Sequence, residues 1–300
     1  HGGGSSMKRA QCIKLAKLAS NNNRVALIEA LRGIVGDGDA ARVNSWAYHA
    51  KRLADWLGDD MADAAPFTIF ARGNSKLPFY AFSALPLVSC PGMGACSKFC
   101  YSLRAWRYPA AFFRQLQNLL LIKQAPDDKR FNQTNLIADA FRKLPTAATL
   151  RLYVDGDIDS GDTLAFWFNL LRERGDVQAY GYSKSWHVFL KFHADNGPAS
   201  FPTNYRLNLS SGSRYGADIA ERMQALPCVR GEFVAVPSTV KQAKDGSNWR
   251  EYAASVRQSA LATGHGRVFV CPGKCGTCTA AGHACGLGSF NGVKIAIGIH

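Results

Sequence analysis

Apolar and polar residues repeat with helical spacing over the first sixty residues of the chain. In residues 23–35 and 44–64, apolar side chains recur every three or four positions, the spacing of one face of an α-helix. Each segment opens with Asn or Ser, which commonly cap the start of a helix. We therefore expect residues 7–65 to form a helical N-terminal region.

From Pro66 onward the pattern changes to one of strands and helices. Aromatic and β-branched residues in 67–85 predict a strand or hairpin, and helices are predicted over 108–124 and 131–144. Beyond Pro145, short apolar strands alternate with amphipathic helices. The predicted strands cover 149–158, 177–183, 205–213, 231–238 and 266–273, and the predicted helices cover 162–175, 185–194, 216–226 and 248–260.

This alternation predicts right-handed βαβ units and a parallel sheet. The expected class is α/β, with a partial or complete (β/α) barrel-like sheet resembling a TIM barrel. We divide the chain into a tag or linker scar (1–6), the helical region (7–65) and a β/α domain (66–300). The sequence contains no run of eighteen apolar residues, so no membrane span is predicted. We expect a cytoplasmic protein.

Polar residues follow several of the predicted strands. Function in parallel α/β folds gathers at the carboxyl ends of the strands, so these residues are expected on one edge of the sheet. The candidate catalytic residues are Asp155, Asp157, Lys184 and Arg214. Asp155 is also a candidate for binding a cofactor ribose or a substrate amine. The alternative interpretation of this segment is structural. An acidic residue would end the strand, and Ser160 or Asp162 would cap the helix that follows.

Seven of the nine cysteines lie in two short segments about 170 residues apart. In a reducing compartment, clustered cysteines favour metal ligation or catalysis over disulfides. We call Cys90, Cys96 and Cys100 the first cysteine group, and Cys271, Cys275, Cys278 and Cys285 the second cysteine group. Both groups follow predicted strands, so we expect them at the same strand-end edge of the sheet.

The second cysteine group has the compact spacing C-x3-C-x2-C-x6-C, with glycines that permit tight turns. Four thiolates suit a [4Fe–4S] cluster, with zinc as the alternative. The first cysteine group, C-x5-C-x3-C, offers three thiolates and leaves a ligand position for a distant residue, water or a small molecule. Cys12, Cys228, His265 or His283 could complete a site, and the two groups could also share one.

Charged and aromatic residues add two expectations. Arg104 and Arg107 lie beside the first cysteine group, where arginine raises a cluster's reduction potential or binds a carboxylate or phosphate, so both are candidate cofactor-binding residues. The net charge of +14 favours a nucleotide or nucleic-acid partner. Five aromatic residues could either stack on nucleic-acid bases or pack in the hydrophobic core. They are Trp106, Tyr108, Tyr180, Tyr182 and Trp186.

Three loop cysteines that precede a β/α array, the last followed by an aromatic residue, resemble the radical S-adenosylmethionine enzymes. The usual spacing in that superfamily, C-x3-C-x2-C, is found here at Cys271, Cys275 and Cys278. More closely, "GNSKLP" and "CPGMGACSKFCYS", with a cysteine cluster near the C-terminus, resemble the Gene product 88 family of phage and plasmid proteins over roughly residues 68–290.

These resemblances imply a mobile-element protein that binds one or two [4Fe–4S] clusters. Membership of the radical superfamily would add S-adenosylmethionine as a cofactor and a nucleotide or nucleic-acid substrate. The alternative is a metal-stabilised nucleic-acid-binding or regulatory protein without enzymatic activity, containing iron–sulfur or zinc.

Overall fold

The computed structural model describes residues 9–61, 64–98, 100–124 and 136–299. The tag-like segment and the beginning of the helix predicted over 131–144 lie outside these residues. No helix in the described ranges combines the length and the apolar character needed to cross a membrane.

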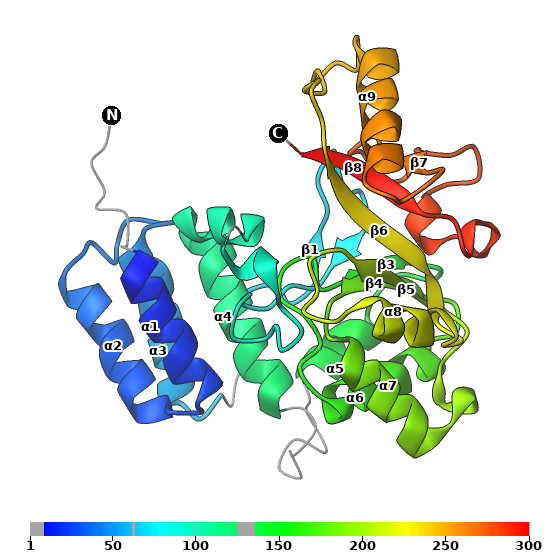
Figure 1. The fold of residues 1–300 in the computed structure, drawn as a ribbon. Helices are drawn as coiled ribbons and strands as arrows, with labels where there is room; N and C mark the ends of the chain where they lie inside the picture. The colour runs from blue at the N-terminus through cyan, green and yellow to red at the C-terminus, as the bar shows by residue number, and fades with distance from the viewer. Residues whose placement is uncertain (1–8, 62–63, 99, 125–135, 300) are drawn as a thin grey trace.

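The N-terminal layer consists of three helices that pack beside a fourth (Figure 1). Asn23 and Ser45 cap α2 and α3 by accepting hydrogen bonds from the N–H groups of Ala26 and Tyr48. The helical prediction for this region is therefore confirmed for the residues described. The helices of the chain are α1 (Arg9–Ser20), α2 (Arg24–Gly36), α3 (Trp46–Gly58), α4 (Pro109–Gln124), α5 (Leu136–Arg142), α6 (Gly161–Glu173), α7 (Trp186–Asn196), α8 (Ala217–Gln224) and α9 (Trp249–Ala262).

The strands of the described residues form one eight-stranded sheet in the order β1-β2-β3-β4-β5-β6-β8-β7. All neighbouring pairs are parallel except β1 and β2, so the predicted mostly parallel α/β sheet is confirmed. No pairing of β1 with β7 closes a barrel within the described residues. The strands are β1 (Ala71–Arg72), β2 (Tyr80–Ala81), β3 (Thr149–Leu152), β4 (Gln178–Ser183), β5 (Tyr205–Ser210), β6 (Val229–Pro237), β7 (Phe269–Val270) and β8 (Ile295–Ile299).

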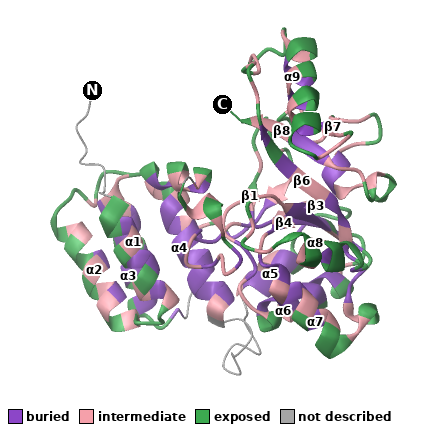
Figure 2. Cartoon of the chain, viewed as in Figure 1, coloured by how far each residue is buried: buried purple, intermediate pink, exposed green. Residues whose placement is uncertain are grey.

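The two faces of the sheet have different partners. Leu150, Ala179 and Leu207 alternate with more polar neighbours and belong to the large hydrophobic core formed with the helices. Figure 2 shows buried segments both in the sheet and in the helices beside it. On the opposite face, Tyr180 and Tyr182 pack against the loop that follows β7. The helices thus leave one sheet face to the segment that carries the second cysteine group.

The last strand is the main difference from the sequence prediction. Residues 295–299 form β8, which inserts between β6 and β7, whereas no strand was predicted there. The segment is short and follows a glycine-rich loop, so it gives little periodic signal of its own. Its pairing with β6 over five residue pairs stabilises it.

The cap of α6 provides a test of the fold. Ser160 accepts a hydrogen bond from the N–H of Thr163, so Ser160, and not Asp162, is the capping residue. We expect Ser160→Ala to lower the free energy of unfolding by about 1 kcal/mol. Asp162→Ala, the matched control, removes a first-turn carboxylate and is expected to cost about 0.5 kcal/mol or less. Urea unfolding would measure both, and a larger loss for the control would contradict this assignment.

Candidate metal and substrate site

The first cysteine group lies across the carboxyl ends of the central strands. Its segment pairs with the loop after β5, where the N–H of Arg214 donates to the carbonyl of Gly92 (3.1 Å) and the N–H of Gly94 donates to that of Gly212 (3.2 Å). In the same loop, the hydroxyl of Ser213 donates to the carbonyl of Lys184, which directly follows β4 (3.1 Å). The predicted position at the strand ends is therefore confirmed for this group.

Gly92 makes this close approach possible. A Cβ atom at this position would lie 1.8 Å from the carbonyl oxygen of Lys184, a distance that no side chain tolerates. The glycine thus lets the backbone of the first cysteine group rest directly on the loop after β4.

Asp157 connects β3, the first cysteine group and Lys184. Its carboxylate accepts the N–H of Lys184 (2.8 Å), and its own N–H donates to the hydroxyl of Ser89 (3.4 Å). Burial raises the pKa of Asp157, whereas the hydrogen bond from Lys184 lowers it. Burial also raises the pKa of the Cys90 thiol to about 12, with a further increase from the Asp157 charge and from Cys100. Asp157 therefore fixes the backbone of this site.

The other candidate residues have distinct surroundings. The ammonium group of Lys184 donates to the hydroxyl of Ser210 (2.8 Å) beside the first cysteine group. Asp155 accepts a hydrogen bond from Gln115 (2.9 Å), and burial raises its pKa while Ser102 and Arg151 lower it. Arg214 donates to the hydroxyl of its neighbour Tyr215. The structure thus brings Asp155, Asp157, Lys184 and Arg214 to the same end of the sheet.

The second cysteine group begins directly after β7 and folds back over the sheet. The N–H of Cys271 donates to the carbonyl of Ala296 (2.7 Å), and that of Cys275 donates to the carbonyl of Lys76 (2.8 Å), between β1 and β2. Gly276 and Gly282 have φ values of 93° and 122°, which only glycine adopts readily. The loop therefore reaches from one end of the strand order to the other.

Backbone groups already donate to the sulfur atoms of this group. The N–H of Gly273 approaches Sγ of Cys271 (3.4 Å), and the N–H of Ala284 approaches Sγ of Cys278 (3.3 Å). Burial raises the pKa of Cys271 to about 12 and that of Cys285 to about 11, and the neighbouring thiols add to both increases. The four thiols are therefore close enough to interact electrostatically.

In the described ranges, no three Cys, His, Asp or Glu side chains are placed closely enough to hold a metal ion. The metal-ligand and cofactor predictions thus stay predictions, including the three-cysteine and four-cysteine division. Cys12 and Cys228 are buried in the main hydrophobic core, Cys12 in α1 and Cys228 just before β6, apart from both groups. His283 lies within the second group but packs against the rings of Phe79 and Tyr180. His265 follows α9.

Arg230 anchors the second cysteine group to the sheet. Its guanidinium is fully buried and donates to the carbonyls of Phe290 (2.8 Å) and Val293 (2.7 Å) and to the side chain of Asn208. Asn208 in turn donates to the carbonyl of Cys285 (3.0 Å). Cys285 therefore lies over the face of the sheet, which corrects the expectation that the whole group would lie at the strand ends.

Arg151 lies close to the second cysteine group, and sequence analysis missed it. Its guanidinium is 4.7 Å from the ring centroid of Tyr182 and interacts electrostatically with Tyr101, which follows Cys100, and with Cys275. Its buried Nε has no hydrogen-bond partner in the described structure. The available signal was a single arginine within an apolar strand, which suggests a polar task on that face.

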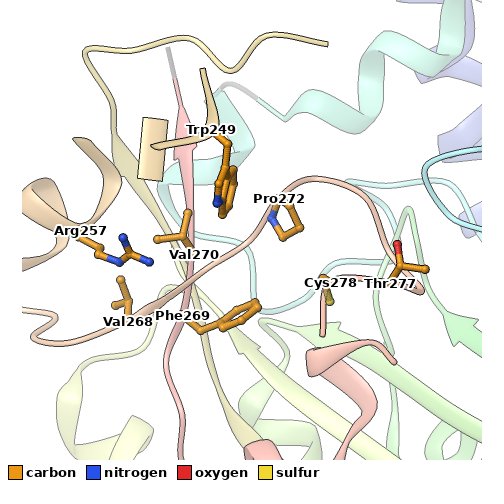
Figure 3. A pocket seen from close by; sticks show the side chains of 8 residues that line it. All are labelled: Trp249, Arg257, Val268, Phe269, Val270, Pro272, Thr277 and Cys278. Carbon is orange, nitrogen blue, oxygen red and sulfur yellow. The ribbon is translucent and has the colours of Figure 1, made fainter. Parts of the chain in front are cut away.

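A pocket of about 340 Å³ borders the second cysteine group on the side of α9 (Figure 3). Trp249 contributes from α9 and Phe269 from β7, while Cys278 forms part of the opposite wall. The remaining lining residues are Arg257, Val268, Val270, Pro272 and Thr277. The pocket therefore lies between α9 and the loop of the second group.

Fold and site together define an α/β protein with a mostly parallel sheet, whose strand ends and open face are covered by two cysteine-containing segments. The family model of Gene product 88 matches residues 63–287, and the chain belongs to this family. No curated protein and no solved structure matches the chain.

The anchoring role of Arg230 predicts a large loss of stability on substitution. Arg230→Met leaves the part-buried carbonyls of Phe290 and Val293 and the buried side chain of Asn208 without their donor, and we expect the free energy of unfolding to fall by about 3 kcal/mol. The matched control is Arg206→Met, because Arg206 donates to carbonyls near the surface and should cost less than about 1 kcal/mol. Urea unfolding that gives equal losses would contradict the anchoring role.

Proposed function

We propose that the chain is an iron–sulfur protein whose second cysteine group binds a closed [4Fe–4S] cluster. The observation that carries the proposal is the charge around this group. Arg230 and Arg151 both face it, and neither forms an ion pair with a carboxylate within the described residues. The electrostatic partners of Arg230 are Cys285 and Tyr182, and those of Arg151 include Cys275.

A thiolate-bound metal centre fits these residues. Four cysteine thiolates bring more negative charge than one metal ion neutralises, and two guanidinium groups would offset the excess. The N–H groups of Gly273 and Ala284 already approach sulfur, and the buried hydroxyl of Tyr180 lies beside Cys275. Zinc would fit the same charges, whereas the compact ligand spacing favours the iron–sulfur cluster.

We further propose that Cys90, Cys96 and Cys100 hold an open cluster in a cytoplasmic radical S-adenosylmethionine-like enzyme of a mobile element. Such a cluster would leave one iron for S-adenosylmethionine and supply one electron for its reductive cleavage. The chain would bind and orient the substrate at the strand ends, with Lys184 as the cationic group and Asp155 as the acceptor there. Asp157 would position Lys184 through its backbone. The positive net charge supports a nucleotide or nucleic-acid substrate.

A partial barrel would suit this reaction because it surrounds the strand ends with protein. We infer such curvature from the hydrogen bond between Cys275 and Lys76, which joins the loop after β7 to the segment between β1 and β2. These elements stand at opposite ends of the strand order.

Metal analysis tests the cluster proposal. On anaerobically purified protein we expect about eight irons and eight sulfides per chain, or about four if one cluster alone is bound. Cys275→Ala should lose the iron of the second group, whereas Cys12→Ala, a cysteine in the helical core, should retain all of it. Stoichiometric zinc without sulfide would contradict the proposal.

Electron paramagnetic resonance separates the enzyme from the alternative, a metal-stabilised nucleic-acid-binding or regulatory protein. An open cluster should change its reduced spectrum when S-adenosylmethionine is added, and Cys96→Ala should abolish that change. Cys285→Ala, which affects the second group, should leave it intact. An unchanged wild-type spectrum, with the cluster present, would favour the non-enzymatic protein.

A further inference from the structure

The segment that contains the first cysteine group belongs to a strongly basic part of the chain. Residues 64–126 contain no Asp or Glu and seven Lys or Arg. The carboxylates that approach the first cysteine group from outside this segment, Asp155 and Asp157, are turned inward and hydrogen-bonded. The outer surface of the segment is therefore a positive region within a chain of net charge +14.

Two tyrosines and two arginines form an exposed stripe on this segment. They lie on and directly after a 3-10 helix, η2 (Tyr101–Arg107). Because side chains three positions apart eclipse in a 3-10 helix, Tyr101, Arg104 and Arg107 share one face, which extends about 12 Å. All three are exposed, whereas Ser102 and Trp106 on the other faces are buried. We call Tyr101, Arg104, Arg107 and Tyr108 the tyrosine–arginine stripe.

The stripe presents its rings and charges to solvent. Tyr101 is 65% exposed and Tyr108 is 55% exposed, which is unusual for large side chains in this protein. The guanidinium of Arg107 lies 5.0 Å from the ring centroid of Tyr108, and in the described structure neither arginine forms an ion pair. Tyr101 and Tyr108 therefore lie at the surface with the exposed arginines beside them.

We propose that this stripe binds single-stranded nucleic acid, with unpaired bases stacked on Tyr101 and Tyr108 and phosphates bound by Arg104 and Arg107. The inference rests on the proposed function in one respect. Tyr101 directly follows Cys100, a proposed cluster ligand, so the stripe would place a bound strand beside that cluster. Exposed aromatic rings interleaved with unpaired arginines are the usual platform for single strands. In a duplex the bases already stack on one another and cannot stack on the rings.

Equilibrium binding of fluorescent oligonucleotides to the anaerobically purified full chain tests this proposal. The probes are a single-stranded DNA, a single-stranded RNA of the same sequence and the corresponding duplex DNA. We expect at least one of the single strands to bind more tightly than the duplex, and the stronger of the two identifies the sugar. Affinity should fall steeply with salt because phosphate contacts release counterions.

Substitutions distinguish stacking from charge. Tyr101→Ala and Tyr108→Ala should each weaken single-strand binding about tenfold, whereas Tyr101→Phe, which keeps the ring, should bind as the wild type does. Arg104→Gln should reduce the slope of log affinity against log salt by about 0.7. Arg250→Gln, an exposed arginine on α9, is the matched control and should leave the slope almost unchanged. Thermal unfolding checks that each variant is folded.

Several results would overturn the proposal. These are equal binding of wild type and both alanine variants, a preference for duplex DNA, or binding to anionic phosphatidylserine vesicles without oligonucleotide binding. Iron content measured on the same samples separates this proposal from the cluster proposal. If the protein contains iron but binds no single strand, only the nucleic-acid-binding proposal fails. If it contains no iron but binds single strands through the stripe, only the cluster proposal fails.

Discussion

The buried guanidinium of Arg230 is the interaction on which the arrangement of the C-terminal half depends. A fully buried charge is costly unless every donor finds an acceptor, and here Asn208 and the carbonyls of Phe290 and Val293 supply them. The same contacts fix the end of the cysteine loop on the sheet, and Asn208 extends them to Cys285. One side chain thereby joins β5, β6 and the segment before β8.

This anchor also explains how the second cysteine group comes to lie over the sheet on which the first group rests. Parallel strands bring the first group to their carboxyl ends, and the returning loop brings the second group over the neighbouring face. Arg151 lies on that face between Tyr101 and Cys275. A positive charge at this position would raise the reduction potential of a nearby cluster, because it favours the reduced form.

Much of the fold could be predicted from the sequence because its elements are locally periodic. Local patterns predict the helices α2 and α3 and the strand–helix alternation after Pro145. They also predict that Cys90 lies at the strand ends. The order β6-β8-β7 could not be predicted, because it is decided by pairing between segments distant in sequence. Arg151 and Arg230 also escaped notice, since a single arginine in an apolar strand does not reveal which side chains surround it in space.

The central claim is that the second cysteine group binds an iron–sulfur cluster whose negative charge is offset by Arg151 and Arg230. The most direct test is iron K-edge X-ray absorption on a variant in which Cys90, Cys96 and Cys100 are all replaced by alanine, so that any iron belongs to the second group. The account predicts iron surrounded by sulfur alone. Absence of iron, or iron coordinated by nitrogen and oxygen, would contradict it.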